Sequence, residues 1–336
     1  MPDSPRRAPA LVIAHRGASA LLPEHTLAAY ARAIADGADF IEPDLVCTRD
    51  GVLVARHEDE IGGTTDVAQH PHFAARHATR TIDGKRVSGW FASDFTLAEL
   101  KTLRARERLP HLRSTAHDGE FEIPTLDEIV ALLATATGDR VVGLMPEIKQ
   151  PTYFRKLGLP MEEILLAQLD AHAVTRTAPV VIQSFETGNL RWLRERLDGR
   201  ANVRLLQLID KADRHPADLP GLTCTQMITR EGLRGIGEYA HIVGVPLRAV
   251  VPLDADGALA APTTLVDDAH AHGVQVMPYP YRPENAYLAP ALRLGEDPRT
   301  VHEAGAIAEI RAALAAGIDG LFTDHPGIGR AAVDGA

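Results

Sequence analysis

Residues 40–57, with the sequence Phe-Ile-Glu-Pro-Asp-Leu-Val-Cys-Thr-Arg-Asp-Gly-Val-Leu-Val-Ala-Arg-His, contain two apolar stretches separated by only five residues, 47–51. Each stretch has the length and composition of a β-strand. Parallel neighbours need a connection of a dozen or more residues, so these two strands must form an antiparallel hairpin that turns at Asp50-Gly51. The second strand of this pair therefore does not belong to a parallel sheet.

Similar apolar stretches recur along the chain, and amphipathic helical patterns lie between most of them. The nine strand candidates are Leu11–Ala14, Phe40–Val46, Val52–Arg56, Val141–Glu147, Pro179–Phe185, Val203–Ile209, His241–Pro246, Val274–Tyr279 and Gly320–Thr323. The helical patterns are His25–Ala35, Leu126–Ala136, Met161–His172, Thr187–Leu197, Glu231–Tyr239, Thr263–His272 and Ala304–Ala316. This alternation predicts an α/β fold with parallel strands and crossover helices.

Without the return strand of the hairpin, eight strands remain, the number in a TIM-type (β/α)8 barrel. A doubly wound sheet is the competing architecture, but it is expected to carry a glycine-rich loop after its first strand, where this chain has His15-Arg16-Gly17. We expect one catalytic domain over residues 1–336, since barrels of this size count as one domain. Residues 47–124, with one further helix-like stretch at 96–103, are expected to form a small insertion subdomain after the second barrel strand.

Composition excludes several functional classes. The chain has 45 acidic and 35 basic residues and a net charge of -10, which disfavours binding to nucleic acid or an acidic membrane but not to a small phosphate substrate. Its two cysteines, Cys47 and Cys224, do not form a disulfide framework or a structural zinc site. No apolar stretch is long enough for stable membrane insertion. Met1 to Ala10 lack a signal-peptide pattern, so we expect a cytoplasmic protein, or a periplasmic or secreted one if a signal has been removed. Nothing in the sequence indicates an oligomeric state.

Polar side chains gather where predicted strands end, and the carboxyl ends of barrel strands form the active-site face. His15-Arg16-Gly17 closes the first strand, and Glu147-Ile148-Lys149 closes the strand from residue 141. Glu42 and Asp44 are two residues apart, so they point to the same side of the second strand. The hairpin then places His57 beside this carboxylate pair.

These residue types form a coherent chemical set. Three carboxylates suit a hard divalent cation such as Mg²⁺ or Ca²⁺. Arg16 and Lys149 suit a phosphate oxyanion, and two histidines can act as base and acid. Each pattern alone is more often structural, but their joint occurrence at successive strand ends predicts metal-dependent cleavage of a phosphodiester.

Several longer stretches resemble the glycerophosphodiester phosphodiesterase family over residues 11 to about 327. They are 15–19 (His-Arg-Gly-Ala-Ser), 22–26 (Leu-Pro-Glu-His-Thr), 37–45, 48–57, 146–149, 182–185, 277–279 and 320–326. Pro23-Glu24-His25-Thr26, Thr65-Asp66-Val67-Ala68 and the long insertion are most similar to the bacterial, periplasmic-type branch.

The resemblance implies a role for each site residue. His15 and His57 are the implied acid/base pair, with Arg16 and Lys149 as phosphate ligands. The implied ligands of one divalent cation, Ca²⁺ or Mg²⁺, are Glu42, Asp44 and Glu147, and the residues implied to line the glycerol side are Phe185 and Tyr279. The implied reaction converts a glycerophosphodiester and water to glycerol 3-phosphate and an alcohol, either by attack of the substrate's own 2-hydroxyl through a cyclic phosphate or by direct attack of water.

The chain departs from the family pattern at three places. Glu58 stands where the family usually has Asp, Gly63 stands where it usually has Arg, and Tyr279-Pro280-Tyr281-Arg282 replaces Trp-Thr-Val-Asn. The missing arginine puts the packing of its loop in question. Two other enzyme activities fit the same residues, that of a lysophospholipase D and that of a phosphodiesterase for polyol-phosphate polymers. A barrel that binds phosphate or metal without turnover is a third alternative.

Overall fold

The computed structural model describes residues 9–136, 140–197 and 199–335. Residues 1–8, on which most of the expectation about a signal peptide rests, lie outside the described residues. The strands are β1 (Leu11–His15), β2 (Phe40–Glu42), β3 (Asp44–Cys47), β4 (Leu53–Ala55), β5 (Ala78–Ile82), β6 (Lys85–Gly89), β7 (Gly143–Leu144), β8 (Glu147–Ile148), β9 (Val180–Ser184), β10 (Val203–Leu208), β11 (Ile242–Pro246), β12 (Gln275–Tyr279) and β13 (Gly320–Thr323). The described α-helices are α1 (Leu27–Ala35), α2 (Leu97–Leu100), α3 (Leu126–Thr135), α4 (Pro151–Lys156), α5 (Met161–Ala171), α6 (Gly188–Arg196), α7 (Cys224–Met227), α8 (Arg230–Gly237), α9 (Leu247–Val250), α10 (Leu265–His270), α11 (Glu303–Ala315) and α12 (Pro326–Asp334).

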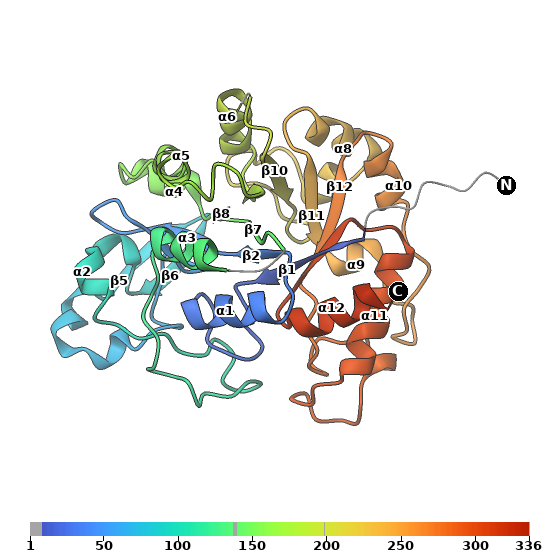
Figure 1. Cartoon of the computed structure of the whole chain (residues 1–336), viewed down its shortest axis with the longest axis horizontal. Helices are drawn as coiled ribbons and strands as arrows, with labels where there is room; N and C mark the ends of the chain where they lie inside the picture. The colour runs from blue at the N-terminus through green and yellow to red at the C-terminus, as the bar shows by residue number, and fades with distance from the viewer. Residues whose placement is uncertain (1–8, 137–139, 198, 336) are drawn as a thin grey trace.

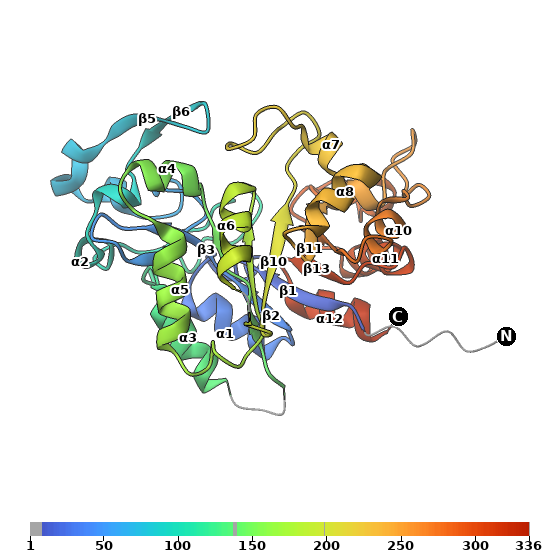
Figure 2. The same ribbon diagram turned by 90° about the horizontal axis from the view of Figure 1, so that it is seen from above.

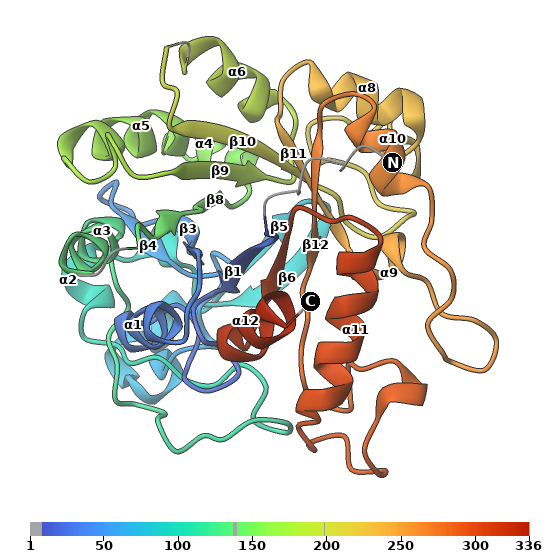
Figure 3. The ribbon, with the colours of Figure 1, turned by 45° about the vertical axis from the view of Figure 1, so that its right-hand side comes forward.

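The strands form the predicted α/β barrel, with helices around the outside (Figures 1 and 3). The hydrogen-bonded order is β12-β11-β10-β9-β7-β2-β1-β13, and these neighbours are parallel. The second barrel strand is interrupted at Pro43, which has no N–H to donate, and continues as β3. The third is likewise divided into β7 and β8, and β8 pairs with β3 and β9.

Backbone hydrogen bonds between the segments of β12 and β13 close the barrel. The Asp319 N–H donates to the Val276 carbonyl at 2.9 Å, and the Tyr281 N–H donates to the Phe322 carbonyl at 2.8 Å. Tyr281 and Thr323 also form a parallel bridge. The fold is therefore a TIM-type (β/α)8 barrel, as the spacing of strand candidates predicts.

The hairpin that reduces nine strand candidates to eight is confirmed. β3 and β4 are antiparallel, with Val46 opposite Val54. The turn contains Gly51 at φ 82, and the Thr48 N–H donates to the Val52 carbonyl at 2.9 Å. This hairpin carries the chain back toward the carboxyl end of the second barrel strand, where the Arg56 N–H donates to the Asp44 carbonyl at 3.0 Å.

Two apolar clusters stabilise the barrel. The smaller one fills its interior and contains Ile13, Phe40, Met145, Val181, Leu206, Leu208, Ile242, Met277 and Phe322. The larger one lies between the strands and the surrounding helices. Burial of each large apolar side chain contributes roughly 1.5–3 kcal/mol, so these clusters provide a rigid support for polar groups at the strand ends.

The segment 47–124 is more regular than the sequence predicts. It contains the antiparallel β5–β6 hairpin, which projects from the barrel (Figure 2), and α2, which is shorter than the helix-like stretch 96–103. Phe73 and Phe95 of this segment are buried in the larger apolar cluster. Within the described residues, none of the helices combines the length and apolar character needed to cross a bilayer.

Candidate active site

The turn that follows β1 contributes the first residues of the candidate site. Arg16 and Gly17 have left-handed φ values of 62 and 87. A Cβ at Gly17 would lie 2.8 Å from Ala29 of α1, so this position accepts only glycine without a shift of the helix. The turn directs the Arg16 backbone N–H to the Glu42 Oε2, at 2.8 Å.

The three predicted carboxylates lie together at the carboxyl ends of the second and third barrel strands. Glu42 ends β2, Asp44 begins β3 on the far side of Pro43, and Glu147 begins β8 as the register partner of Asp44. One oxygen from each of these three lies within 4.8 Å of the others, and all three side chains are buried. We call Glu42, Asp44 and Glu147 the carboxylate triad.

The electrostatics of the triad fit a divalent cation. Burial raises the pKa of Glu42 well above its usual range, and the neighbouring Asp44 and Glu147 raise it further. Burial also raises the pKa of Glu147, despite the opposing effect of Lys149. Burial acts to raise the pKa of Asp44 as well, but Lys149 and the adjacent histidines outweigh it and hold that pKa well below its usual range. A cation bound to all three oxygens would remove the mutual repulsion that the metal-free carboxylates experience.

Arg16 and Lys149 border the triad, as predicted. The Lys149 Nζ lies 2.7 Å from the Glu147 Oε1 and 3.6 Å from the Asp44 Oδ1. The Arg16 Nε lies 3.3 Å from the Asp44 Oδ2, and its Nη1 donates to the Glu24 Oε2 at 3.1 Å. Both cations are buried, so they can contact an anion with little competition from water.

His15 is held by an ion-pair network whose members are far apart in the sequence. Its Nδ1 lies 2.6 Å from the Asp324 Oδ1, and the Asp324 Oδ2 accepts hydrogen bonds from Arg113 at 2.6 Å and Arg282 at 2.8 Å. Because a carboxylate only accepts, Nδ1 carries the proton and Nε2 is the ring atom available for proton transfer. Burial and, second, Arg16 lower the pKa of His15 to about 4, although Asp324 opposes this shift.

His57 also has a carboxylate beside it. Its Nδ1 lies 2.8 Å from the Glu58 Oε1, without the angles of a hydrogen bond. Arg108 donates to both oxygens of Glu58 and to both oxygens of Glu24, at 2.7–2.8 Å. Burial, followed by the charge of Arg16, lowers the pKa of His57 to about 3.

The loop that lacks the family's arginine is nevertheless packed. Ile61, Thr64 and Thr65 are buried, and the Thr65 hydroxyl donates to the Ile61 carbonyl at 2.7 Å. Gly63 faces open space, since a Cβ added at this residue would meet no atom within 4 Å. The packing of the loop therefore does not depend on an arginine at this position.

The structure places His25 outside the helix predicted over residues 25–35. The helical pattern at 25–35 places it in a helix, but α1 begins at Leu27 after the N-cap Thr26, and His25 has φ 56. Its fully buried ring contacts the Asp44 Oδ2 through Nε2 at 2.8 Å and the Tyr30 hydroxyl through Nδ1 at 2.7 Å. His25 thus orients a triad member, a role that the prediction missed.

Gln183 and Asp324 were also missed as site residues. Gln183, within β9, donates to the Glu42 Oε1 at 2.8 Å. Asp324 directly follows β13, so the rule that located the other strand-end residues could have identified it. No comparable signal marks Arg113, which reaches the site from the segment 47–124.

Phe185 and Tyr279 form an aromatic wall beside the cations. Their ring centroids are 6.3 Å apart with an interplanar angle of 85°, and both pack on the interior apolar cluster. The Lys149 Nζ lies 5.5 Å from the centroid of the Phe185 ring. The Tyr279 hydroxyl donates to the Ile209 carbonyl, so the rings present mainly apolar surface.

Family comparison agrees with this geometry. Residues 15–328 match the model of the glycerophosphoryl diester phosphodiesterase family. The chain is 36% identical over 328 residues to glycerophosphodiester phosphodiesterase GDPD6 of Arabidopsis thaliana, covering 94% of this chain and 83% of the plant protein. It is 32% identical over 230 residues to a glycerophosphodiester phosphodiesterase of Haemophilus influenzae, covering 63% of this chain and 60% of the bacterial protein.

Solved structures share the fold. A phosphodiesterase of Oleispira antarctica, solved in complex with the product sn-glycerol-3-phosphate, superposes with a TM-score of 0.61 at 19% identity and 97% coverage of both chains. A glycerophosphoryl diester phosphodiesterase of Parabacteroides distasonis gives 0.60 at 17% identity, covering 99% of this chain and 88% of that one. By its family match and its sequence identity to curated relatives, the chain belongs to the glycerophosphoryl diester phosphodiesterase family.

Proposed function

We propose that the chain catalyses metal-dependent hydrolysis of glycerophosphodiesters to glycerol 3-phosphate and an alcohol. The observation that carries this proposal is the buried carboxylate triad, bordered by Arg16 and Lys149, with His15 at the end of β1 and His57 just after β4. The activities named for its relatives, and the product bound to the Oleispira antarctica enzyme, support this substrate class.

In this proposal each group has one task. A divalent cation, Ca²⁺ or Mg²⁺, held by Glu42, Asp44 and Glu147 would supply Lewis-acid stabilisation of phosphate charge. Arg16 and Lys149 bind phosphate oxygens, since both are buried cations at this end of the barrel. The Phe185 and Tyr279 rings border the glycerol part of the substrate.

The histidines move the protons. His15, with Nδ1 fixed by Asp324, presents Nε2 for transfer, and His57 has Glu58 beside its Nδ1. One ring takes the proton of the attacking hydroxyl, and the other delivers a proton to the leaving oxygen. The attacking group is either the substrate's 2-hydroxyl or water. A substrate that lacks the 2-hydroxyl distinguishes them, since its ready turnover would exclude the cyclic phosphate.

The decisive test is an assay of glycerol 3-phosphate release from glycerophosphocholine with added Mg²⁺ or Ca²⁺. We expect release that depends on the metal. Lysophosphatidylcholine and a polyol-phosphate polymer serve as parallel substrates. Preferential turnover of either would favour the corresponding alternative, and no turnover of any of the three would favour a non-catalytic barrel.

We further propose that the segment 47–124 is an insertion subdomain that completes the site. It supplies His57 and Glu58, and its Arg108 and Arg113 bind the carboxylates behind the catalytic groups. The same segment and the Pro23-Glu24-His25-Thr26 motif support assignment to the bacterial, periplasmic-type branch, although a plant protein is among the relatives. Fractionation of the source cells would test a cytoplasmic against a periplasmic or secreted location.

A further inference from the structure

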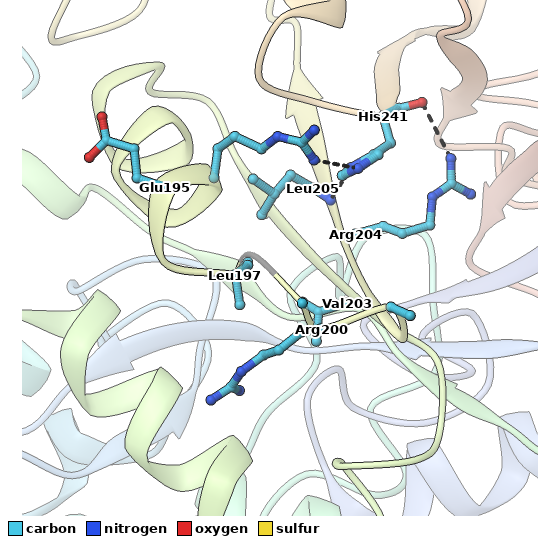
Figure 4. Close-up of a pocket in the computed structure, with 10 residues that line it drawn as sticks. Glu195, Leu197, Arg200, Val203, Arg204, Leu205 and His241 are labelled. Atoms are coloured by element: carbon cyan, nitrogen blue, oxygen red, sulfur yellow. Dashed lines mark hydrogen bonds between the residues drawn. The ribbon is translucent and has the colours of Figure 1, made fainter.

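A charged cavity lies at the amino-terminal end of the barrel strands, opposite the carboxylate triad. Its volume is about 610 Å³, and its lining comes from the end of α6, the described residues of the loop between α6 and β10, the start of β10 and the residue before β11 (Figure 4). The charged or titratable side chains in this lining are Arg194, Glu195, Arg200, Arg204 and His241. In the described part of the lining, three arginines and a histidine therefore accompany one carboxylate, in a chain whose net charge is -10.

Two of these arginines lack an acidic partner. Among the described residues, neither Arg194 nor Arg204 has a carboxylate within ion-pair distance, whereas Arg200 is bound by Asp170. The hydrogen bonds of Arg204 to described residues go to neutral acceptors, the Gln275 side chain at 2.6 Å and the His241 carbonyl at 3.5 Å. Glu195 points away from the His241 ring in Figure 4. Among the described residues, Arg194 and Arg204 thus have no ion-pair partner, and Asp319 acts on Arg204 only by raising its pKa against the lowering by burial.

The contacts of His241 indicate that a hydrogen-bond acceptor is missing from the cavity. The Leu205 backbone N–H donates to His241 Nδ1 at 3.0 Å, so a neutral ring carries its proton on Nε2. That Nε2 lies 2.8 Å from the Nη1 of Arg194, which is also a donor. Two donors therefore face each other at 2.8 Å, and an acceptor oxygen beside the pair, within reach of both nitrogens, would satisfy both.

We propose that this cavity binds a phosphate-type oxyanion. Arg194 and the Nε2–H of His241 donate to the anion, and Arg204 adds positive charge from the neighbouring strand. A tetrahedral anion with several acceptor oxygens can satisfy a guanidinium and an imidazole N–H together. The ligand is either inorganic phosphate or a small phosphate monoester, because the cavity is set into one end of the barrel.

Equilibrium dialysis of the metal-loaded protein against labelled inorganic phosphate tests the proposal. The active site also binds phosphate, so we measure binding in an Arg16→Gln/Lys149→Gln background. There we expect one phosphate per chain, and we expect Arg194→Gln to weaken its binding by about tenfold or more, the usual effect of a lost charged hydrogen bond. His241→Phe should also weaken binding, since it removes the second donor.

Arg191→Gln is the matched control. It makes the same charge change on the same helix, but the Arg191 guanidinium lies 4.3 Å from the centroid of the Tyr239 ring and does not line the cavity. Equal weakening by Arg191→Gln and Arg194→Gln would overturn the site in favour of a general charge effect. Absence of binding in the Arg16→Gln/Lys149→Gln background would also overturn it, provided that circular dichroism shows a folded protein.

Competition with glycerol 3-phosphate identifies the source of the phosphate group. Stronger displacement of the label by glycerol 3-phosphate than by unlabelled phosphate would assign an organic monoester to the cavity. Stronger displacement by unlabelled phosphate would assign the free ion. Failure of both to displace label in the Arg16→Gln/Lys149→Gln background would contradict a specific site.

Discussion

The two ends of the barrel carry opposite imbalances of charge. At the carboxyl ends of the strands, the triad gathers three buried carboxylates, and Arg16 and Lys149 are both paired with them. At the amino-terminal ends, Arg194 and Arg204 have no carboxylate partner among the described residues. An excess of buried carboxylate favours binding of a cation, and two arginines without a carboxylate partner favour binding of an anion. We therefore propose two sites of different chemistry in one barrel, and we assign catalysis to the carboxyl end alone.

Removal of the metal should have the largest effect on hydrolytic activity. Without a divalent cation, burial and mutual repulsion keep the pKa values of Glu42 and Glu147 high, and phosphate charge loses its main stabilising partner. We expect chelation with EDTA to abolish release of glycerol 3-phosphate, and added Mg²⁺ or Ca²⁺ to restore it. Comparison of the two ions in the restored protein then identifies the preferred metal. Full turnover by protein shown to be metal-free would contradict the role of the triad.

Loss of either histidine proposed for proton transfer should have the next largest effect on activity. We expect His15→Ala and His57→Ala each to lower kcat by at least ~10²-fold, the usual scale of acid–base catalysis. Steady-state kinetics with glycerophosphocholine measures this loss. His270→Ala, at a histidine far from the site on α10, is the control and should retain kcat. A near-normal rate for either active-site variant would remove that residue from the mechanism.

Asp324→Asn should have a smaller effect that acts through His15. Asp324 raises the pKa of His15 against the stronger lowering by burial and Arg16, so the substitution should lower that pKa further. We expect kcat to fall by roughly 10–10²-fold and the limb of the pH–rate profile that reports His15 to move to lower pH. A reduced rate with an unchanged profile would assign Asp324 a structural role, through its contacts with Arg113 and Arg282.

The barrel and the grouping of the three carboxylates at its carboxyl end were predictable because local rules determine them. The five residues between the two stretches of 40–57 leave room only for a hairpin, and that hairpin brings His57 to the carboxylates. Alternate residues of a strand share a face, so Glu42 and Asp44 had to lie together. The β5–β6 hairpin was missed although Asp83-Gly84, with φ values of 48 and 75, is a readable two-residue turn.

The supporting groups of the site were not predictable in the same way. Asp324 meets His15 across 309 residues of sequence, and Arg113 reaches Asp324 across 211. Such contacts follow from barrel closure and from the path of the segment 47–124, which no periodicity encodes. His25 was misplaced because the helical pattern continues through it, whereas its left-handed φ and the N-cap at Thr26 become visible only in the structure.

The smallest effect on activity is expected from substitutions at the amino-terminal end of the barrel strands. Arg194→Gln/Arg204→Gln removes two cations near the first residues of β10, and a strand of this length separates them from the carboxyl-end groups by roughly 15–20 Å. Interactions between distant sites are usually additive, and salt screens charges over such a distance. We therefore expect kcat/KM for glycerophosphocholine to stay within about twofold of wild type in phosphate-free buffer. A loss of tenfold or more in a folded variant would show that the two ends are energetically coupled, and the cavity would then have to be treated as part of the catalytic apparatus.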